Sequence, residues 1–94
     1  MVRHIVVWKT KDTTTKEDLQ DLKRRSEALK EIPGVIEIEF EINPLEGSNS
    51  QICLNALYAT KKDLDDYKVN PIHVEFGTHL RPLVSDRSAF DYNC

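Results

Sequence analysis

Residues 35–43, with the sequence VIEIEFEIN, alternate apolar and polar side chains without interruption. Successive side chains of a β-strand point to opposite faces of its sheet, so this period of two predicts a strand with one buried face. The buried face is expected to carry four residues: Ile36, Ile38, Phe40 and Ile42. Val35 is expected on the solvent face with the glutamates. The chain must therefore build a sheet that has a core on one side.

Three other segments have strand character. Residues 2–10, VRHIVVWKT, are rich in β-branched side chains and nearly continuous in hydrophobicity, which is typical of a strand buried on both faces. Residues 52–60 follow the loop PLEGSNSQ and predict a hairpin partner for residues 35–43. The last strand is expected over 88–93, SAFDYN.

Helix-start signals precede two further segments. Thr14, followed three residues later by Glu17, fits a capping box for a helix that extends to about Ile32, where a Pro-Gly pair ends it. Thr60 is expected to begin a second, shorter helix. An Asn-Pro pair interrupts the helical pattern that follows, and it predicts another helix over 71–81.

This order of elements predicts an α+β fold, a ferredoxin-like sandwich of one four-stranded antiparallel sheet with helices on one face. The whole chain, 1–94, is expected to be a single domain. The other face of so small a sheet needs cover. A second copy of the chain is the natural source, so we expect a homodimer.

Composition limits the partners and the compartment. A net charge of −3 provides no basic footprint for nucleic acid, and no apolar stretch near the start resembles a signal peptide or a membrane span. Cys53 and Cys94 are too few and too scattered for a disulfide framework or a zinc site, which favours the cytoplasm. Cys53 is expected in the core and Cys94 on the surface.

Residues 65–83, DYKVNPIHVEFGTHLRPLV, contain the most informative local signal. Asn70 is a favoured N-cap residue and Pro71 suits the first helical position, so the pair ends one helix and starts another in a new direction. An apolar stripe then recurs at helical spacing: Ile72, Phe76, Leu80 and Leu83. His73 and His79 flank the two edges of that stripe.

The position of His73 allows two interpretations. In the first turn of a helix the positive end of the helix dipole favours the neutral imidazole, which is the form a general base requires. The other interpretation is a boundary histidine that hydrogen-bonds to backbone. His73 and His79 point to opposite edges of the apolar stripe, and the pair Glu75 and His79 is expected to be a surface contact. Neither a metal site nor a cofactor is therefore expected.

Several motifs along the chain resemble one family. These are an early HIVVWK, a Pro-Gly-Val turn, the run Y-x-x-N-P-x-H-V-x-F-G-x-x-L-R-P over 67–82, and a final FDY. Together they resemble the stress-responsive A/B-barrel (Dabb) family over nearly the whole chain. The resemblance implies a ferredoxin-like protomer whose homodimer forms an α+β barrel.

The resemblance also implies candidate site residues. The family includes stress-induced plant proteins and olivetolic acid cyclase-like polyketide cyclases, which carry out an intramolecular aldol condensation. The catalytic residues carried over from those cyclases are His73, Tyr67 and His4. The cyclase has a tyrosine in its first helix where this chain has Ser26, so the pocket wall is expected to differ there.

Three functional hypotheses follow. The first is a dimeric A/B-barrel protein with a pocket for a small apolar or carbonyl-containing molecule. The second is a cofactor-free enzyme of the cyclase or isomerase type, in which His73 removes a proton next to a carbonyl and Tyr67 orients the base or the developing enolate. The third is a structural stress protein with a filled interior. The first two hypotheses share a pocket and differ in whether the chain is an enzyme.

Overall fold

The computed structural model describes all 94 residues. The elements follow one another in the order β1 (Val2–Thr10), α1 (Lys16–Arg25), the 3₁₀ helix η1 (Ser26–Glu31), β2 (Val35–Glu41), β3 (Ile52–Tyr58), α2 (Lys61–Val69), α3 (Pro71–Leu80), the 3₁₀ turn η2 (Arg81–Leu83) and β4 (Val84–Asn93). The last strand is therefore four residues longer at its start than the sequence predicts.

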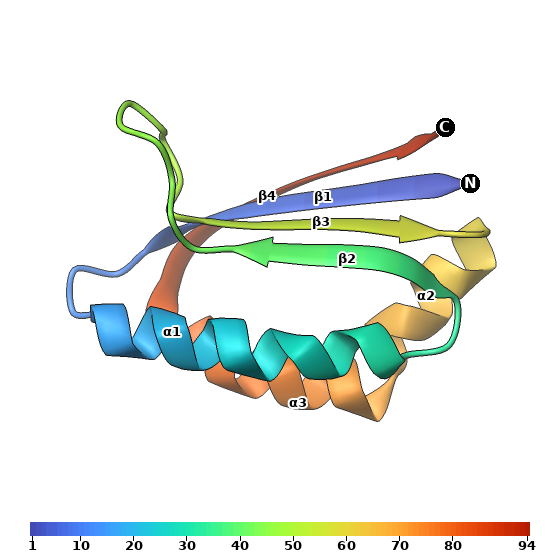
Figure 1. The fold of residues 1–94 in the computed structure, drawn as a ribbon, viewed down its shortest axis with the longest axis horizontal. Coiled ribbons are helices and arrows are strands. Elements are labelled where there is room, and N and C mark those ends of the chain that lie inside the picture. The colour runs from blue at the N-terminus through green and yellow to red at the C-terminus, as the bar shows by residue number, and fades with distance from the viewer.

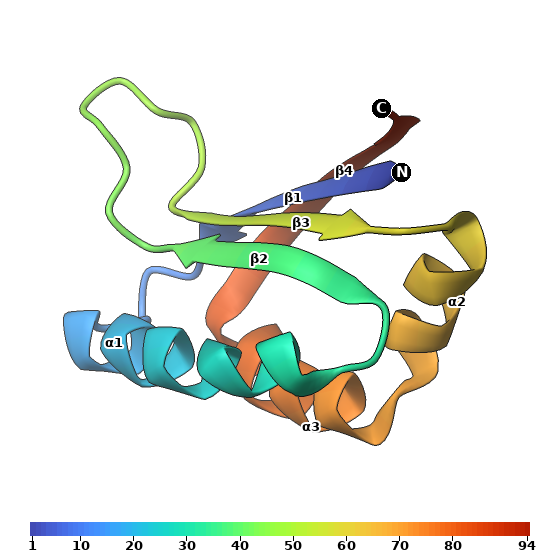
Figure 2. The same cartoon turned by 45° about the vertical axis from the view of Figure 1, so that its right-hand side comes forward.

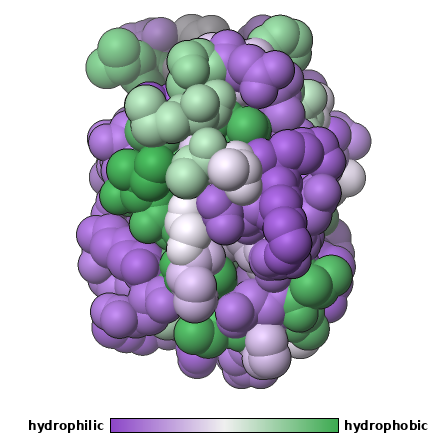
Figure 3. Space-filling view, turned by 90° about the vertical axis from the view of Figure 1, so that its right-hand side faces the viewer, coloured by the Kyte–Doolittle hydropathy of each residue, from purple (hydrophilic) through white to green (hydrophobic).

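The four strands form one antiparallel sheet in the order β2-β3-β1-β4, and all the helices cover one face of it (Figure 1). This confirms the predicted α+β ferredoxin-like fold and the hairpin of β2 with β3. β1 lies in the interior of the sheet and pairs with β3 on one side and β4 on the other. The chain ends meet at one end of the sheet, where the amide of Cys94 donates to the carbonyl of Met1 at 2.9 Å (Figure 1). Hydrophilic and hydrophobic residues are mixed on the surface of this end of the molecule (Figure 3).

The core lies between the sheet and the helices. β1 buries Val2, Val6 and Trp8 on the helix side, and β3 buries Ile52, Leu54, Ala56 and Tyr58 there. The helices contribute Leu22, Leu29, Leu64, Tyr67, Phe76 and Leu80. At about 25 cal/mol per Å² of apolar surface removed from water, this single layer of contacts supplies most of the stabilisation available to the protomer.

One end of β2 departs from the simple alternation. The pairing of β2 with β3 shifts register between Val35 and Glu37, so two residues of β2 face one residue of β3 there. Such a bulge turns the next side chain to the opposite face. The assignment of Ile36 to the core and Val35 to solvent is therefore wrong: Ile36 is 52% exposed, whereas Val35 packs against the core. Ile38 and Phe40 are buried, as predicted.

The helix starts agree with the capping chemistry to within one residue. The first helix is capped by Thr15 with Asp18, rather than by Thr14 with Glu17. The hydroxyl of Thr15 accepts from the amide of Asp18, and the Asp18 carboxylate accepts from the amide of Thr15. Thr60 caps α2, as predicted. None of these helices has the length and apolar character that a membrane span requires.

The sheet face opposite the helices is apolar at its centre and bare. Its side chains include Ile5, Val7 and Leu57, with Phe90 and Tyr92 beside them on β4. Phe90 is 68% exposed. The prediction that Cys53 is a core residue is wrong, because its side chain lies half-buried on this outer face. Cys94 is exposed, as predicted.

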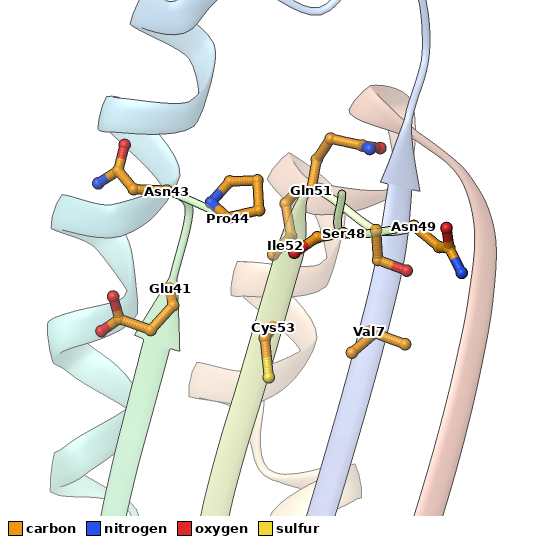
Figure 4. Close-up of a pocket in the computed structure, with 10 residues that line it drawn as sticks. Val7, Glu41, Asn43, Pro44, Ser48, Asn49, Gln51, Ile52 and Cys53 are labelled. Carbon is orange, nitrogen blue, oxygen red and sulfur yellow. The ribbon is translucent and has the colours of Figure 1, made fainter. Parts of the chain in front are cut away.

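The loop between β2 and β3 extends beyond the sheet (Figure 2). Between it and the outer sheet face is a hollow of about 390 Å³ whose lining includes Val7, Asn43, Gln51 and Cys53 (Figure 4). Burial and nearby glutamates raise the pKa of the Cys53 thiol, which keeps it protonated and unreactive. The hollow therefore offers amides and apolar groups, and it lies on the face that we expect a second copy to cover.

Candidate functional site

A second cavity, of about 190 Å³, lies between α3 and the sheet. It is lined by His4, Val6, Trp8, Leu54, Tyr67, His73, Phe76, Gly77, Leu80, Arg81 and Arg87. The three residues expected from the sequence, His4, Tyr67 and His73, therefore line one space. They come from β1, the end of α2 and the start of α3. This cavity is smaller than the hollow under the β2–β3 loop, but it gathers two histidines, a tyrosine and two arginines around an apolar interior.

Aromatic rings connect the three residues. The ring of His73 lies 4.6 Å from that of Tyr67, Tyr67 lies 5.1 Å from Tyr58, and Tyr58 lies 6.3 Å from His4, all between ring centroids. Tyr58 is fully buried, and its hydroxyl makes no hydrogen bond of normal geometry, although the Tyr67 hydroxyl is close enough to affect its pKa. The series extends from the mouth of the cavity to the central strand. Contacts of this kind hold each ring in one orientation.

The helix break determines how His73 is held. In a continuous helix the amide of Ile72 would donate to the carbonyl of Lys68, four residues earlier. Here that amide donates instead to the side-chain oxygen of Asn70, at 2.9 Å. The carbonyl of Lys68 is thereby left to accept from Nδ1 of His73, at 3.0 Å. The Asn-Pro pair thus transfers a backbone acceptor from the helix ladder to the histidine.

This hydrogen bond also selects the tautomer of His73. Donation by Nδ1 requires the proton to be on that nitrogen, so Nε2 carries the free lone pair of the neutral ring. The backbone contact that the second sequence interpretation expected is present, and it leaves the other nitrogen available as a base.

Burial dominates the ionisation of the site. It lowers the pKa of His73, and the positive charges of His4, Arg87 and Arg81 lower it further, against the opposing effect of the Lys68 carbonyl. Burial raises the pKa of Tyr67 to about 12. Burial also raises the pKa of Tyr58, and the neighbouring Tyr67 adds to this effect. At neutral pH the His73 ring is therefore neutral, and the hydroxyls of Tyr58 and Tyr67 keep their protons.

His4 is paired inside the sheet. It stands directly opposite Asp91 on β4, and its Nδ1 contacts the Asp91 carboxylate. His4 is buried, whereas the Asp91 side chain is about one-third exposed. A carboxylate on Nδ1 fixes the orientation of the ring.

Four residues of this region were not found from the sequence: Tyr58, Arg81, Arg87 and Asp91. Asp91 and Arg87 lie on the same face of β4, four residues apart, and they join the site only because β4 pairs with β1 in one register. The alternation of Arg87, Ala89 and Asp91 would have revealed that face once β4 was assumed to begin before Ser88.

Two other expectations concern residues outside this cavity. Ser26 does not line it, so the prediction that this residue alters the pocket wall is wrong. Its hydroxyl donates to the carbonyl of Lys23 at 2.6 Å, and Ser26 lines a separate hollow that also includes Lys23 and Glu27. His79 contacts the Glu75 carboxylate at 3.1 Å on the helix surface. No group of three or more metal-ligating side chains is gathered anywhere in the chain.

Comparisons with known proteins agree with this fold. A dimeric protein of unknown function with a ferredoxin-like fold from Bacteroides fragilis is 28% identical, with 99% of this chain and 95% of that one covered and a TM-score of 0.88. A dimeric ferredoxin-like protein from Thermobifida fusca is 21% identical, with 99% and 90% covered and a TM-score of 0.91. A Dabb family protein from Mesorhizobium loti is 21% identical, with 99% and 95% covered and a TM-score of 0.82.

A search of curated proteins gave no significant match. The model of one protein family, the stress-responsive A/B barrel domain, matches residues 2–94. This match covers all the elements that frame the cavity, from β1 to β4. The chain therefore belongs to the stress-responsive A/B-barrel (Dabb) domain family.

Proposed function

We propose that this chain acts as a homodimer in which the cavity beneath α3 of each protomer binds a small apolar or carbonyl-containing molecule. The observation that carries the proposal is the convergence of His4, Tyr67 and His73 on one cavity of about 190 Å³. Small-molecule sites combine an apolar lining with a few convergent polar groups, and this cavity has both. The dimeric state of related structures and the bare outer sheet face support the homodimer.

One observation favours a catalytic role for the same cavity. His73 keeps Nε2 free because Nδ1 donates to a backbone carbonyl, which is the arrangement that a general base needs. In that role His73 would remove a proton from the carbon next to a substrate carbonyl. The Tyr67 hydroxyl would donate to the enolate oxygen, and His4 would complete the polar wall. This corresponds to a cyclase- or isomerase-type reaction that uses protein side chains alone.

A structural role without a ligand predicts a filled interior. The cavity therefore supports the two hypotheses that need one. The same alternative predicts that His73→Ala and Tyr67→Phe both lower the melting temperature by more than about 8 °C, which is a large change for a domain of this size. We expect both variants to melt at or above the temperature of the unmodified protein, because residues kept for a site often reduce stability.

Binding can be followed with the protein's own fluorescence. Trp8 is the single tryptophan and lines the cavity, so a bound molecule should change its emission. The probe is 4-phenyl-2-butanone, an apolar ketone, and the control is Val74→Ser, an exposed position of α3 that does not line the cavity. Saturable binding is expected in both proteins. A linear, non-saturating response would contradict the proposed pocket.

The catalytic alternative has a separate test with the same ketone. In D₂O, a base in the cavity should exchange the hydrogens next to the carbonyl for deuterium, which NMR detects directly. Loss of a general base typically costs about 10²–10⁴ in rate, so His73→Ala should exchange at the buffer rate. Exchange that is equal in the presence and absence of the unmodified protein would leave a binding pocket without this reaction.

A further inference from the structure

Two arginines line the cavity without a partner in the protomer. Arg81 comes from η2 and Arg87 from β4. The nine ion pairs of the protomer involve other residues. Asp91 contacts the cavity residue His4, and Glu75 on α3 contacts His79, so neither carboxylate is paired with these arginines. The cavity therefore carries two uncompensated positive charges.

The backbone of α3 makes room for one of these arginines. A Cβ added to Gly77 would lie 2.8 Å from Nη1 of Arg81, too close for any real contact. The guanidinium of Arg81 thus lies across the helix at the place where a side chain is missing. Glycine is less favourable than alanine in the interior of a helix, so its presence here has a cost in helix stability.

The opposite end of the cavity is apolar. Trp8, Leu54 and Phe76 line it and are almost completely buried. The arginines are exposed, so they stand at the mouth, while the apolar side chains form the depth. A molecule that fills this space must be apolar at one end and negatively charged at the other.

We propose that the ligand of this cavity is an organic carboxylate whose apolar body lies against Trp8 and Phe76 and whose carboxylate is bound by Arg81 and Arg87. The inference rests on the proposed small-molecule pocket and specifies the chemical class of its ligand. Guanidinium groups match the planar carboxylate with charge-assisted hydrogen bonds, and they hold it more firmly where water is partly excluded.

The same contact should act on His73. The titratable and charged groups that face its ring are His4 from β1, Arg81 from η2 and Arg87 from β4, with Tyr67 packed on it from α2. Both arginines contribute to the lowered pKa of His73. A bound carboxylate neutralises their charge, so the pKa of His73 should rise towards its ordinary value. The ligand would thereby strengthen the base beside it.

The test compares three compounds on one skeleton by Trp8 fluorescence. These are 3-phenylpropionate, which is charged, and 3-phenyl-1-propanol and 4-phenyl-2-butanone, which are neutral. We expect the carboxylate to bind about tenfold or more tightly than either neutral compound at low salt, because each charge-assisted hydrogen bond is stronger than a neutral one. The preference should shrink as salt is added.

Variants separate this inference from the pocket itself. Arg81→Gln and Arg87→Gln should each weaken carboxylate binding by about tenfold and leave the two neutral compounds unaffected. Gly77→Ala removes no charge and should stabilise α3, yet its Cβ displaces the Arg81 guanidinium and should also weaken carboxylate binding. The control is Arg24→Gln on α1, which is outside the cavity.

The outcomes are distinct. Equal affinity for the charged and neutral compounds would overturn the carboxylate assignment and leave the pocket standing. Absence of binding by all three would overturn the pocket and this inference together. An independent test follows the His73 ring protons by NMR. The midpoint of their pH titration should move to higher pH when 3-phenylpropionate is bound. An unchanged midpoint would contradict the proposed contact between the carboxylate and the two arginines.

Discussion

At the scale of single residues, the buried hydroxyl of Tyr58 is expected to reduce the stability of the fold. Its hydroxyl is buried and has no hydrogen-bond partner, although its ring packs against Tyr67. Leaving such a group unsatisfied costs about 1–3 kcal/mol. Tyr58→Phe keeps the ring and removes the hydroxyl, so we expect a higher melting temperature, by about 4–8 °C for each kcal/mol gained.

Thermal denaturation followed by circular dichroism measures this effect. Tyr92→Phe is the matched control, because Tyr92 is on the outer sheet face and 42% exposed, so its hydroxyl can already bond to water. We expect little change there. A lower melting temperature for Tyr58→Phe would instead indicate that the Tyr58 hydroxyl forms a stabilising hydrogen bond with the Tyr67 hydroxyl.

The ionisation of His73 gives a prediction about pH. Its pKa in the folded protein is below the ordinary 6.5, chiefly because of burial, so the unfolded chain binds the proton more readily. Stability therefore rises with pH in the window just below 6.5 and is lost as the pH falls through it. His73→Asn should lose less stability than the unmodified protein between about pH 7 and pH 5.5.

Urea denaturation at several pH values tests this. His79→Asn is the control, since His79 is on the same helix but outside the cavity, and the acid-induced loss should persist in that variant. If both variants follow the unmodified protein, the proton on His73 does not couple to folding.

At the scale of elements, the break between α2 and α3 has an assignable cause. Asn70 is in an extended conformation and its side chain accepts from the Ile72 amide, so it supplies the cap that keeps the Lys68 carbonyl free for His73. Loss of an N-cap side chain costs typically about 1 kcal/mol. Pro71 fixes a backbone angle but makes no such bond.

We therefore expect Asn70→Ala to lower stability by about 1 kcal/mol and to move the His73 ring, with Pro71→Ala as the milder comparison. Crystal structures of the two variants, with their unfolding free energies, provide the measurement. A shifted His73 in Pro71→Ala but not in Asn70→Ala would assign the geometry to the proline ring instead.

The elements also show which parts of the structure could be predicted from the sequence. Alternation identified β2, and capping chemistry placed the starts of α2 and α3, because these signals are local. The bulge near Ile36 was not visible, since it depends on the pairing with β3. Among the site residues, His73 and Tyr67 lie in one local motif, whereas Arg87 and Asp91 depend on a strand register between segments more than 70 residues apart in the chain.

At the scale of the whole molecule, the outer sheet face is the surface that we expect a second copy of the chain to cover. Phe90 and Tyr92 stand on an edge strand that is exposed along nearly its whole length, next to half-buried Ile5 and Val7. Exposed edges and apolar faces of this kind promote association. A standard interface buries about 1,600 Å² in total, and a second copy placed face to face would cover this surface.

Sedimentation should therefore show a dimer at micromolar concentration, and Phe90→Asp should convert it to a monomer. Val74→Asp is the control, because Val74 is an exposed apolar residue on α3, on the helix side of the sheet. A stable monomer of the unmodified protein, or a Val74→Asp variant that dissociates equally, would contradict an interface on the outer face.

The pairing of β1 with β4 has a consequence for how the molecule is made. His4 on β1 and its partner Asp91 on β4 are 87 positions apart, so α2 and α3 must be synthesised before the pair can form. Until then β1 has a partner on one side only, in β3. Contacts so distant in sequence form slowly, because a long loop must close before they are gained. A nascent chain can thus hold most of its secondary structure and still lack the cavity, which is completed only when β4 pairs with β1.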